Sequence, residues 1–370
     1  MPSPIRVLHI VGSMNRGGVE SWLMALLRRA DRREIAMDFL VHTAEAAAHD
    51  SEIAALGGAV IACPSVHRPA YIREFGAVLS RQEPYDVLHS HVHWFSGLTT
   101  TLARLRGVRL RIAHSHSNSS WRESGTGPLR ALYRTLMRRG MFSSATHLLA
   151  ASGPAACALY GADWSESPRA RVLYCGVDFA PFAATADRES VRREFAIGPS
   201  EIVVGHVGNF HPPKNHVFLA AIAACALGRQ RSVRFLCAGG GPLREQVQAQ
   251  FEHAGVRSIF TGLRNDVPRL LRAMDVFVFP SLYEGLPLAV VEAQAAGLPC
   301  VVSTEVTQEV EAVPGLIRWL PLRAGAGVWA DAVLEAARQP AQAASGLAIM
   351  RRSPFSIETS FANMQAIYQA

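Results

Sequence analysis

Lysine is almost absent from this chain of 370 residues. Lys214 is the only lysine, whereas 36 positions carry arginine, so the sequence uses arginine wherever a generic cation suffices. Apolar runs of about 20 residues, which a membrane-spanning helix needs, are absent too. The six cysteines stand far apart without any C-x-x-C pair, which argues against zinc or redox chemistry. We expect all six to be reduced, buried and structural.

Length and composition favour a two-domain globular protein. The chain is longer than one ordinary hydrophobic core, and 49% of its residues are hydrophobic against 18% that are charged. Residues 1–4 lead directly into the short apolar stretch 5–11, which lacks the pattern of a signal peptide. We therefore expect a cytoplasmic protein, with peripheral attachment to the inner face of the cell membrane left open.

Short apolar runs alternate with amphipathic stretches of helical period, which is the pattern of parallel sheets covered by helices. In the first half we expect strands near residues 5–11, 37–42, 59–63, 86–90, 109–114, 146–151 and 171–175. In the second half we expect them near residues 202–207, 233–238, 259–261, 276–280, 300–303 and 317–320. This α/β pattern predicts two doubly wound domains, 1–175 and 201–352, with a linker at 176–200. Such sheets bind ligands beyond the carboxyl ends of their strands.

The strongest candidate for a ligand site follows the predicted strand 276–280. Pro287 fits the first position of a helix, so we expect that helix to begin just after Gly285. Free backbone N–H groups and the positive end of the helix dipole would then suit a diphosphate. Glu284 and Glu292 stand on either side of this helix start, and a carboxylate accepts hydrogen bonds from two sugar hydroxyls. The alternative is a loop glutamate and a solvated helix glutamate.

The loop after the first strand of the second domain is the next candidate. Residues 208–216 read Gly-Asn-Phe-His-Pro-Pro-Lys-Asn-His. In a chain that otherwise uses arginine, Lys214 suggests a need for a compact ammonium group, and a pyrophosphate is the obvious partner. An ordinary surface lysine is the alternative. The glycines at 239–241 would either reach the nucleotide or simply form a tight turn between strand and helix.

Taken in order, these segments resemble glycosyltransferase family 4, and in particular its bacterial exopolysaccharide and capsule branch. The resemblance covers nearly the whole chain. It rests on Gly17-Gly18-Val19-Glu20, His89-Ser90-His91, Arg111-Ile112-Ala113-His114-Ser115-His116, Gly176-Val177-Asp178, the lysine loop and the paired glutamates. It implies the GT-B fold, a second domain that binds the nucleotide sugar, and a last segment, 353–370, whose helix from Ser356 to Tyr368 crosses back to the first domain.

The resemblance also implies roles for individual residues. The donor site would comprise Gly17, Gly18, Asn209, Lys214, Arg264, Glu284, Gly285, Leu286, Pro287, Leu288 and Glu292. Lys214 would pair with the donor diphosphate, Glu284 would bind sugar hydroxyls and Glu292 would hold the ribose hydroxyls. The backbone of residues 285–288 would complete the phosphate cradle, while Gly18 would approach the diphosphate from the other domain.

Asn209 departs from the family pattern, because many relatives carry an arginine beside the first glycine of the lysine loop. The amide of Asn209 hydrogen-bonds a phosphate oxygen but supplies no charge, so stabilisation of the leaving group would be weaker or come from elsewhere. Arg264 lies in the loop where relatives hold the base, and it would either stack on a uracil or have an ordinary surface role. Uridine is the base that the resemblance favours, with GDP-sugars as the open alternative.

Histidines at the ends of two predicted strands are the catalytic and acceptor-site candidates. The family places its functional histidine where this chain has His114, and an imidazole there would hydrogen-bond the sugar or orient the attacking hydroxyl. His89, His91 and His93 alternate, so they would project from one side if the strand continues. We expect His91, His93 and His116 to line the acceptor site, with structural packing equally open. No metal is expected, because no carboxylate in the neighbouring sequence completes a coordination shell.

Excess positive charge is confined to the first half of the chain. Residues 1–175 contain 20 arginines against 13 acidic residues, whereas residues 176–370 are neutral overall. Nine of these arginines lie within 104–139, and Leu129, Leu132, Leu136 and Phe142 interleave with them. An anionic membrane that bears a lipid-diphosphate-linked acceptor would explain this pattern, and a helix with a solvated basic face is the alternative. No nucleic-acid-binding motif accompanies the charge, so nucleic acid is not an expected partner.

Together the pattern and the resemblance predict a retaining, metal-independent transferase. It would move a sugar from a nucleotide sugar, with UDP as the expected carrier, to a glycan or lipid-linked oligosaccharide in cell-surface polysaccharide synthesis, without any cofactor. No carboxylate is an evident nucleophile, so we expect same-face attack, with His114, Lys214 and Glu284 as the catalytic residues. The absence of G-x-G-x-x-G and G-x-S-x-G argues against a nicotinamide dehydrogenase and a serine hydrolase. A catalytically impaired scaffold, a sugar-nucleotide epimerase of the same fold and a phosphorylase stay as alternatives.

Overall fold

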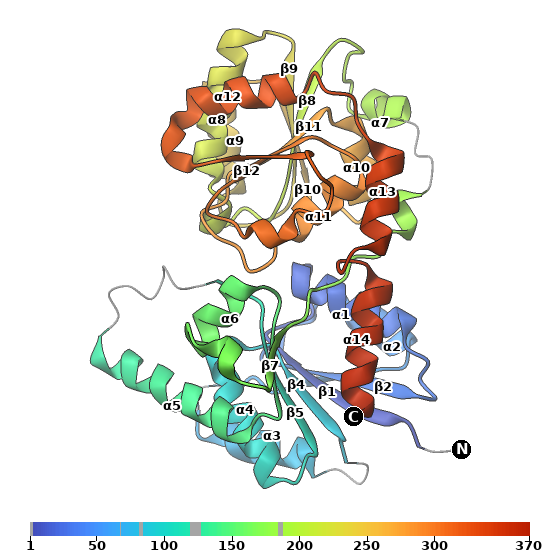
Figure 1. Ribbon diagram of the computed structural model, residues 1–370, viewed down its shortest axis with the longest axis vertical. Helices are drawn as coiled ribbons and strands as arrows, with labels where there is room; N and C mark the ends of the chain where they lie inside the picture. Colours follow the sequence, from blue (N-terminus) through green and yellow to red (C-terminus); the bar gives the residue numbers. More distant parts are fainter. Residues whose placement is uncertain (1–2, 67, 81–83, 119–126, 184–187) are drawn as a thin grey trace. The chain divides into compact units, whose positions relative to one another are not determined.

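The computed structural model describes residues 3–66, 68–80, 84–118, 127–183 and 188–370. It divides into two compact units: unit 1 comprises Met1–Gly176 and Ile357–Ala370, and unit 2 comprises Val177–Ser356. In each unit, helices cover the two faces of one parallel sheet (Figure 1). The prediction of two doubly wound α/β domains is therefore confirmed.

Unit 1 has a parallel sheet of seven strands in the order β3-β2-β1-β4-β5-β6-β7. The strands are β1 (Ile5–Val11), β2 (Ile35–Val41), β3 (Val60–Ala62), β4 (Val87–Ser90), β5 (Leu110–Ser115), β6 (His147–Ala150) and β7 (Ala170–Val172). The helices are α1 (Gly18–Arg29), α2 (Asp50–Ala55), α3 (Ala70–Leu79), α4 (Ser96–Leu105), α5 (Pro128–Ser144), α6 (Gly153–Tyr160) and α14 (Ile357–Gln369). Strand order reverses between β1 and β4, so the carboxyl ends of these two strands form the topological switch point.

Unit 2 has a parallel sheet of six strands in the order β10-β9-β8-β11-β12-β13. The strands are β8 (Ile202–Val207), β9 (Val233–Ala238), β10 (Ser258–Gly262), β11 (Val276–Phe279), β12 (Cys300–Ser303) and β13 (Ile317–Leu320). The helices are α7 (Arg188–Glu194), α8 (His216–Arg229), α9 (Arg244–His253), α10 (Val267–Ala273), α11 (Leu288–Ala295), α12 (Gly325–Ala336) and α13 (Ala343–Arg352). The switch point of this sheet lies between β8 and β11.

Central strands of both sheets are mostly apolar because helices cover both of their faces. Every residue of β9, β11 and β12 is buried. Burial on both faces leaves polar side chains few places within the sheets. The polar groups that could act chemically therefore gather at the strand ends.

The segment predicted to be a linker, 176–200, packs on unit 2 instead. Its helix α7 carries Arg188 and Arg192, whose guanidinium groups both bind the carboxylate of Asp275, at 2.5 and 2.9 Å. Asp275 also accepts a hydrogen bond from the backbone N–H of Val203 at 2.7 Å. These bonds tie α7 to β8 and to the start of β11. Residues 184–187 of the predicted linker lie outside the described residues.

The C-terminal helix α14 lies beside α1 in unit 1 (Figure 1). Trp22 of α1 donates a hydrogen bond from Nε1 to Oγ of Ser360 at 2.9 Å. Arg29 at the end of α1 pairs with Glu358 at 3.0 Å. A buried hydrogen bond and a surface ion pair thus hold the last helix of the chain on the first helix.

The cysteines are all free, but the expectation that all are buried is wrong at two positions. Cys157 on α6 is exposed and Cys225 on α8 is half-buried, while the other four are buried. Both lie on outer helices of their units, where one helix face meets solvent. No pair is bonded.

Candidate active site

The lysine loop of unit 2 and the loop after β11 meet at the switch point. Lys214 ends a short 3₁₀ turn, and the next residue, Asn215, has a left-handed backbone (φ 54°) that starts α8. The side-chain amide of Asn215 donates to the carbonyl of Pro280 at 3.1 Å. Nζ of Lys214 donates to Oε1 of Glu284 at 2.7 Å. The structure therefore brings together two of the residues that the sequence singles out, although 70 positions separate them.

The Lys214–Glu284 pair is partly shielded from water. The exposed fractions of the two side chains are 20% and 14%, and Nζ of Lys214 also lies 4.8 Å from the ring centre of Phe279. A half-buried ion pair is screened less by salt than a surface pair. The ammonium group can still bind an anion from the open side, because it has three N–H donors. Glu284 therefore orients the lysine in the structure.

The helix start after Gly285 differs from the prediction by one position. Pro287 caps α11 with ψ 84°, outside the helical range, and the helix begins at Leu288. The backbone N–H of Leu288 donates to the carbonyl of Leu286 at 3.0 Å, so a tight turn closes before the helix. The amino end of α11 still comes within four positions of Glu284 in the chain, which keeps the positive end of the helix dipole near the Lys214–Glu284 pair.

Glu292 lies one turn into α11. Burial raises the pKa of its carboxyl group to about 7 from an ordinary value of 4.5. A carboxyl group with such a pKa gains from ligand hydroxyl donors, because they stabilise its charged form.

Of two further donor-site candidates, Arg264 and Asn209, the arginine has acidic partners of its own in the structure. Arg264 forms a bidentate ion pair with Asp266, with both N–O distances at 2.7 Å, and also approaches Glu194 at 3.5 Å. The side chain of Asn209 is half-buried in the lysine loop.

The glycine turn at 239–241 packs against the lysine loop, since a Cβ atom on Gly239 would lie 2.0 Å from the carbonyl oxygen of Gly208. Close packing of two backbones accounts for the glycine there.

Two histidines under the lysine loop escaped the sequence analysis. His206 at the end of β8 hydrogen-bonds the carbonyl of Val278 through Nδ1 at 2.9 Å, and burial lowers its pKa to about 4. His216, the first residue of α8, stacks on Phe210 with ring centres 4.0 Å apart. Both imidazoles are neutral, and both pack under the residues of the lysine loop. Their positions at a strand end and a helix start are the signal that could have found them.

Five histidines of unit 1 form one cluster at the other switch point, in which His9, His89 and His114 are buried and the other two are half-buried. The five are His9 on β1, His89 and His91 at the end of β4, and His114 and His116 at the end of β5. His9 and His89 are direct neighbours in the parallel register of β1 and β4. The sequence analysis missed His9, although it stands two residues before the end of a strand, like His89 and His114 near theirs.

The clustered imidazoles hydrogen-bond in two chains. In the first, the hydroxyl of Tyr368 bonds to Nδ1 of His89 at 2.8 Å, and Nε2 of His89 bonds to Nδ1 of His114 at 3.1 Å. In the second, Nδ1 of His9 bonds to Nε2 of His91 at 3.1 Å, and Nδ1 of His91 bonds to Nε2 of His116 at 2.8 Å.

The second chain ends at Cys175, whose Sγ lies 3.5 Å from Nδ1 of His116. Trp22 covers the cluster, and its ring contacts the His114 ring edge-on at 5.4 Å.

Burial keeps every imidazole of the cluster neutral. It lowers the pKa of His9 and of His116 to about 3. Burial, together with repulsion from the neighbouring rings, holds the pKa of His89, His91 and His114 well below 6.5. The cluster thus offers hydrogen bonds rather than charge at any ordinary working pH.

His93 does not join the cluster, so the predicted alternation of three histidines is wrong. Strand β4 ends at Ser90, and the chain then turns into a 3₁₀ helix that begins at His93 with φ 51°. The nitrogen atoms of His9, His89 and His91, and those of His91, His114 and His116, lie within 4.8 Å of one another, close enough to share a metal ion. Both nitrogens of His91 are already hydrogen-bonded to other imidazoles, however, so a metal ion would have to displace those bonds.

Gly17 and Gly18 form the amino end of α1, in the loop that follows β1. Gly17 caps the helix with an extended backbone, and its carbonyl accepts the N–H of Ser21 at 2.9 Å. A Cβ atom on Gly17 would lie 2.2 Å from a carboxylate oxygen of Glu20. This helix end therefore lies beside the histidine cluster at the switch point of unit 1.

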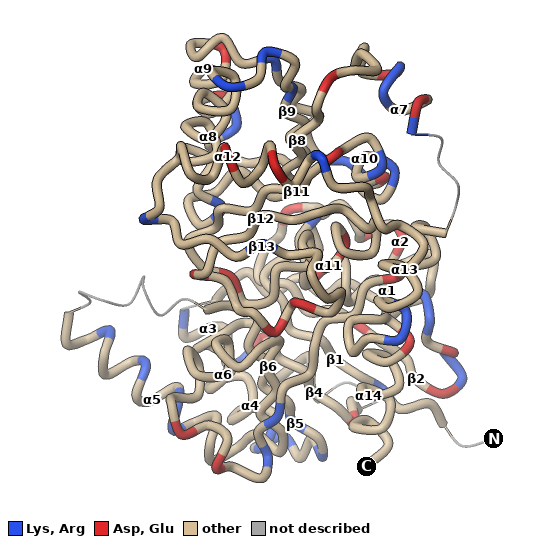
Figure 2. Tube along the Cα trace, turned by 45° about the horizontal axis from the view of Figure 1, so that its top comes forward, with Lys and Arg blue, Asp and Glu red and all other residues tan. Residues whose placement is uncertain are grey.

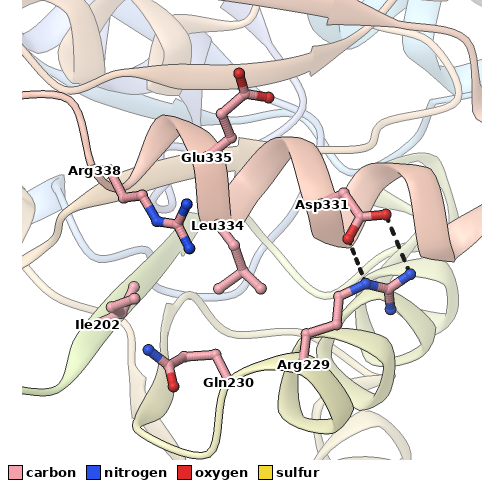
Figure 3. A pocket seen from close by; sticks show the side chains of 7 residues that line it. All are labelled: Ile202, Arg229, Gln230, Asp331, Leu334, Glu335 and Arg338. Atoms are coloured by element: carbon pink, nitrogen blue, oxygen red, sulfur yellow. Dashed lines mark hydrogen bonds and ion pairs between the residues drawn. The ribbon is translucent and has the colours of Figure 1, made fainter.

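A surface hollow of about 500 Å³ in unit 2 lies at the opposite edge of the sheet (Figure 3). Ile202, the first residue of β8, lines it together with Gln230, which follows α8. Arg229 and Asp331 form an exposed ion pair there. Since doubly wound sheets bind ligands at the carboxyl ends of their strands, this hollow is not the donor site.

Comparison with known proteins shows which protein families the chain matches. Residues 201–338 match the family described as glycosyl transferases group 1, and residues 17–176 match the family described as glycosyl transferase 4-like domain. EpsF of Bacillus subtilis (strain 168), which is assigned as a glycosyltransferase, is 37% identical over 342 residues, covering 90% of this chain and 88% of EpsF.

Two further matches are more distant. The UDP-Gal:alpha-D-GlcNAc-diphosphoundecaprenol alpha-1,3-galactosyltransferase of Escherichia coli is 29% identical over 234 residues, covering 61% of this chain and 59% of that enzyme. The crystal structure of Anabaena HepE in complex with UDP and glucose has a TM-score of 0.80 at 18% identity, covering 99% of this chain and 100% of HepE.

Two doubly wound units with this strand order, together with the likeness to HepE, define the GT-B fold. The chain belongs to glycosyltransferase family 4, as its motifs predict.

Proposed function

We propose that this glycosyltransferase moves a sugar from a UDP-sugar to a lipid-diphosphate-linked or glycan acceptor in the synthesis of a cell-surface polysaccharide. The observation that carries the donor assignment is the Lys214–Glu284 pair at the switch point of unit 2, beside the amino end of α11. Support for the base comes from HepE, whose crystal structure holds UDP and glucose. Support for the acceptor comes from the Escherichia coli relative, named for a diphosphoundecaprenol-linked sugar.

The proposed reaction retains the configuration of the sugar and needs no metal ion. The acceptor hydroxyl oxygen attacks the anomeric carbon on the face that the diphosphate leaves, and its proton passes to the departing diphosphate oxygen. Lys214 and the amino end of α11 stabilise the growing negative charge on that diphosphate. Glu292 accepts hydrogen bonds from the ribose, while Glu284 orients Lys214 and binds sugar hydroxyls. His114 is neutral, so it acts through a hydrogen bond.

The acceptor side of the proposal rests on an apolar stripe along α5. Leu129, Leu132 and Leu136 follow one another at helical spacing and are 82%, 55% and 50% exposed. Figure 2 shows basic residues recurring along the same helix. Exposed leucines flanked by arginines fit the interface of an anionic membrane, where a lipid-linked acceptor resides. Among the described residues, no helix is long and apolar enough to cross a membrane.

Other members of the arginine-rich region 104–139 have structural roles. Arg104 and Arg111 donate to the carbonyls of Ser143 and Ser144, at 2.7 and 2.6 Å. Phe142, expected on the membrane face, instead packs against the core of unit 1, because it lies on the side of α5 that faces the sheet. Arg122 and Glu123 lie outside the described residues. The membrane proposal therefore depends on the leucine stripe together with the exposed Arg130 and Arg139.

A panel of nucleotide sugars tested by thermal shift examines the donor assignment directly. A ligand that binds only the folded protein raises its melting temperature by mass action. We expect UDP and one UDP-sugar to stabilise the wild type and to stabilise Lys214→Ala much less. Arg229→Ala is the matched control, because it removes another ion pair of unit 2 at the far edge of the sheet.

Equal stabilisation of Lys214→Ala and the wild type would overturn the diphosphate site. Incubation of the protein with the stabilising UDP-sugar and a short-chain lipid-diphosphate sugar then tests transfer. Formation of an epimerised nucleotide sugar in place of a glycosylated lipid would favour the epimerase alternative. The anomeric configuration of the product, read by NMR, tests retention.

A further inference from the structure

The first hydrogen-bond chain of the histidine cluster begins on the last helix of the protein. Tyr368 of α14 is fully buried, and its hydroxyl lies 2.8 Å from Nδ1 of His89. Nε2 of His89 in turn lies 3.1 Å from Nδ1 of His114, and the two rings are almost parallel, with 2° between their planes. The hydroxyl of Tyr368 is thus linked to the proposed catalytic imidazole through one intervening ring.

A neutral imidazole has one N–H donor and one acceptor nitrogen, so every bond along such a chain must run in the same direction. Among the described residues, the only hydrogen-bond partner of the Tyr368 hydroxyl is Nδ1 of His89. A buried O–H group without an acceptor is costly, so the tyrosine donates. His89 must then carry its proton on Nε2 and donate to Nδ1 of His114.

The far end of the chain selects the same direction. Nδ1 of His114 accepts from His89, so the remaining proton of His114 is on Nε2. Burial is the main influence on the pKa of His114, but a hydrogen-bonding contact with the backbone of Leu173 acts in the opposite direction and favours the protonated ring. A backbone carbonyl can only accept, so this contact also calls for an N–H group on His114. Within the described residues, no group lies at the distance and angle of a regular hydrogen bond to Nε2 of His114.

We infer that Tyr368 is a positioning residue that acts through His89 to hold His114 in the tautomer with its proton on Nε2. In this tautomer Nε2 of His114 carries an N–H group, so it cannot accept the proton of the attacking hydroxyl. The C-terminal helix thereby defines what the imidazole at the site can do. This inference deepens the proposed function and depends on it only for the identity of the substrate.

The tautomer can be measured on the ligand-free protein by long-range ¹H–¹⁵N NMR of a sample labelled at histidine. The signals of His114 are assigned by their loss in His114→Gln. We expect wild-type His114 to show the Nε2–H pattern. In Tyr368→Phe the donor is gone, so the signals of His114 and His89 should shift toward a mixture of both tautomers. Turnover should fall about tenfold, with little change in KM for the donor, since one oriented hydrogen bond is lost.

Tyr71→Phe is the matched control. Tyr71 is equally buried in unit 1, and its hydroxyl bonds to Nε2 of His42 at 3.0 Å, outside the cluster. This variant should leave the tautomer of His114 and the turnover unchanged. An Nδ1–H pattern for His114 in the wild type would overturn the inference without any variant. So would an unchanged pattern in a Tyr368→Phe protein that melts like Tyr71→Phe. Neither result needs enzyme activity, so failure here is distinct from failure of the proposed transfer.

Discussion

The two switch points of the molecule place opposite kinds of polar group at equivalent positions of similar sheets. In unit 2 the loops after β8 and β11 bring together an ammonium group and a carboxylate, Lys214 and Glu284. In unit 1 the ends of β1, β4 and β5 bring together five neutral imidazoles and no lysine. One cluster offers charged groups and the other offers oriented hydrogen bonds.

This difference follows from how deeply each group is buried from water. Lys214 and Glu284 keep some contact with water, so an ion pair survives there at moderate cost. His9, His89 and His114 have no such contact, and burial lowers the pKa of all five clustered histidines. A doubly wound sheet can thus present a charged or a neutral site at the same place, depending on whether the side chains stand in the loops or on the strand ends.

The largest effect should come from removing the charged group of unit 2. Lys214→Ala should lower kcat/KM by about two to three orders of magnitude, because a cation that faces the leaving group is lost. Lys214→Arg should recover only part of this loss, since the guanidinium is larger and planar. Initial rates with the best UDP-sugar measure both. Full activity of Lys214→Ala, with Arg229→Ala as the control, would contradict the role of charge in this unit.

Removing the neutral group of unit 1 should cost less. His114→Ala should lower kcat by roughly 10- to 100-fold while the melting curve keeps its cooperative shape, because a hydrogen bond rather than a full charge is lost. The pKa of His114 is held far below 6.5, so the wild-type rate should show no inflection from this residue between pH 5 and pH 8. An inflection near pH 6.5 that disappears in His114→Ala would show that the imidazole is charged.

Glu292 should make stability depend on pH in unit 2. Its pKa is raised to about 7 by burial, so the folded state holds a proton that the unfolded state, with a value near 4.5, releases. Stability should therefore fall as pH rises from about 4.5 to about 7. Glu292→Gln lacks this loss, so its advantage over the wild type should grow by about 2 to 3 kcal/mol between pH 5 and pH 8.

Urea denaturation at the two pH values measures the difference. A constant gap between wild type and Glu292→Gln at both values would mean that the carboxyl group has an ordinary pKa. UDP binding by the wild type should strengthen as pH rises through 7, whereas binding by Glu292→Gln should stay flat.

The smallest effects are expected on the surface of α5. Leu132→Ser combined with Leu136→Ser should weaken binding to vesicles of anionic lipid about tenfold and leave activity on a soluble acceptor unchanged. Because both leucines are half-exposed, thermal stability should change little. Flotation with liposomes at low and high salt measures binding. Equal flotation of the variant and the wild type would remove α5 from the membrane proposal.

Much of the fold could be predicted from the chain because its signals are local. Each predicted strand lies within a few residues of an observed one, since apolar runs that alternate with helical periods need no distant information. The helix start near Pro287 was predicted to within one residue for the same reason. Predictions failed where a distant contact decided the outcome. The segment 176–200 appeared to be a linker because its partner, Asp275, lies 75 positions beyond its end.

The candidate site shows the same division. The sequence by itself determined the family, the lone lysine and the paired glutamates, because composition and motif order are properties of the chain alone. It could not show that Lys214 binds Glu284, that His9 joins the other histidines, or that His93 turns away from them. Only the tertiary structure decided these points. The order of the strands and the residue at which each strand ends determine which side chains lie together. The burial that results determines whether those side chains carry a charge.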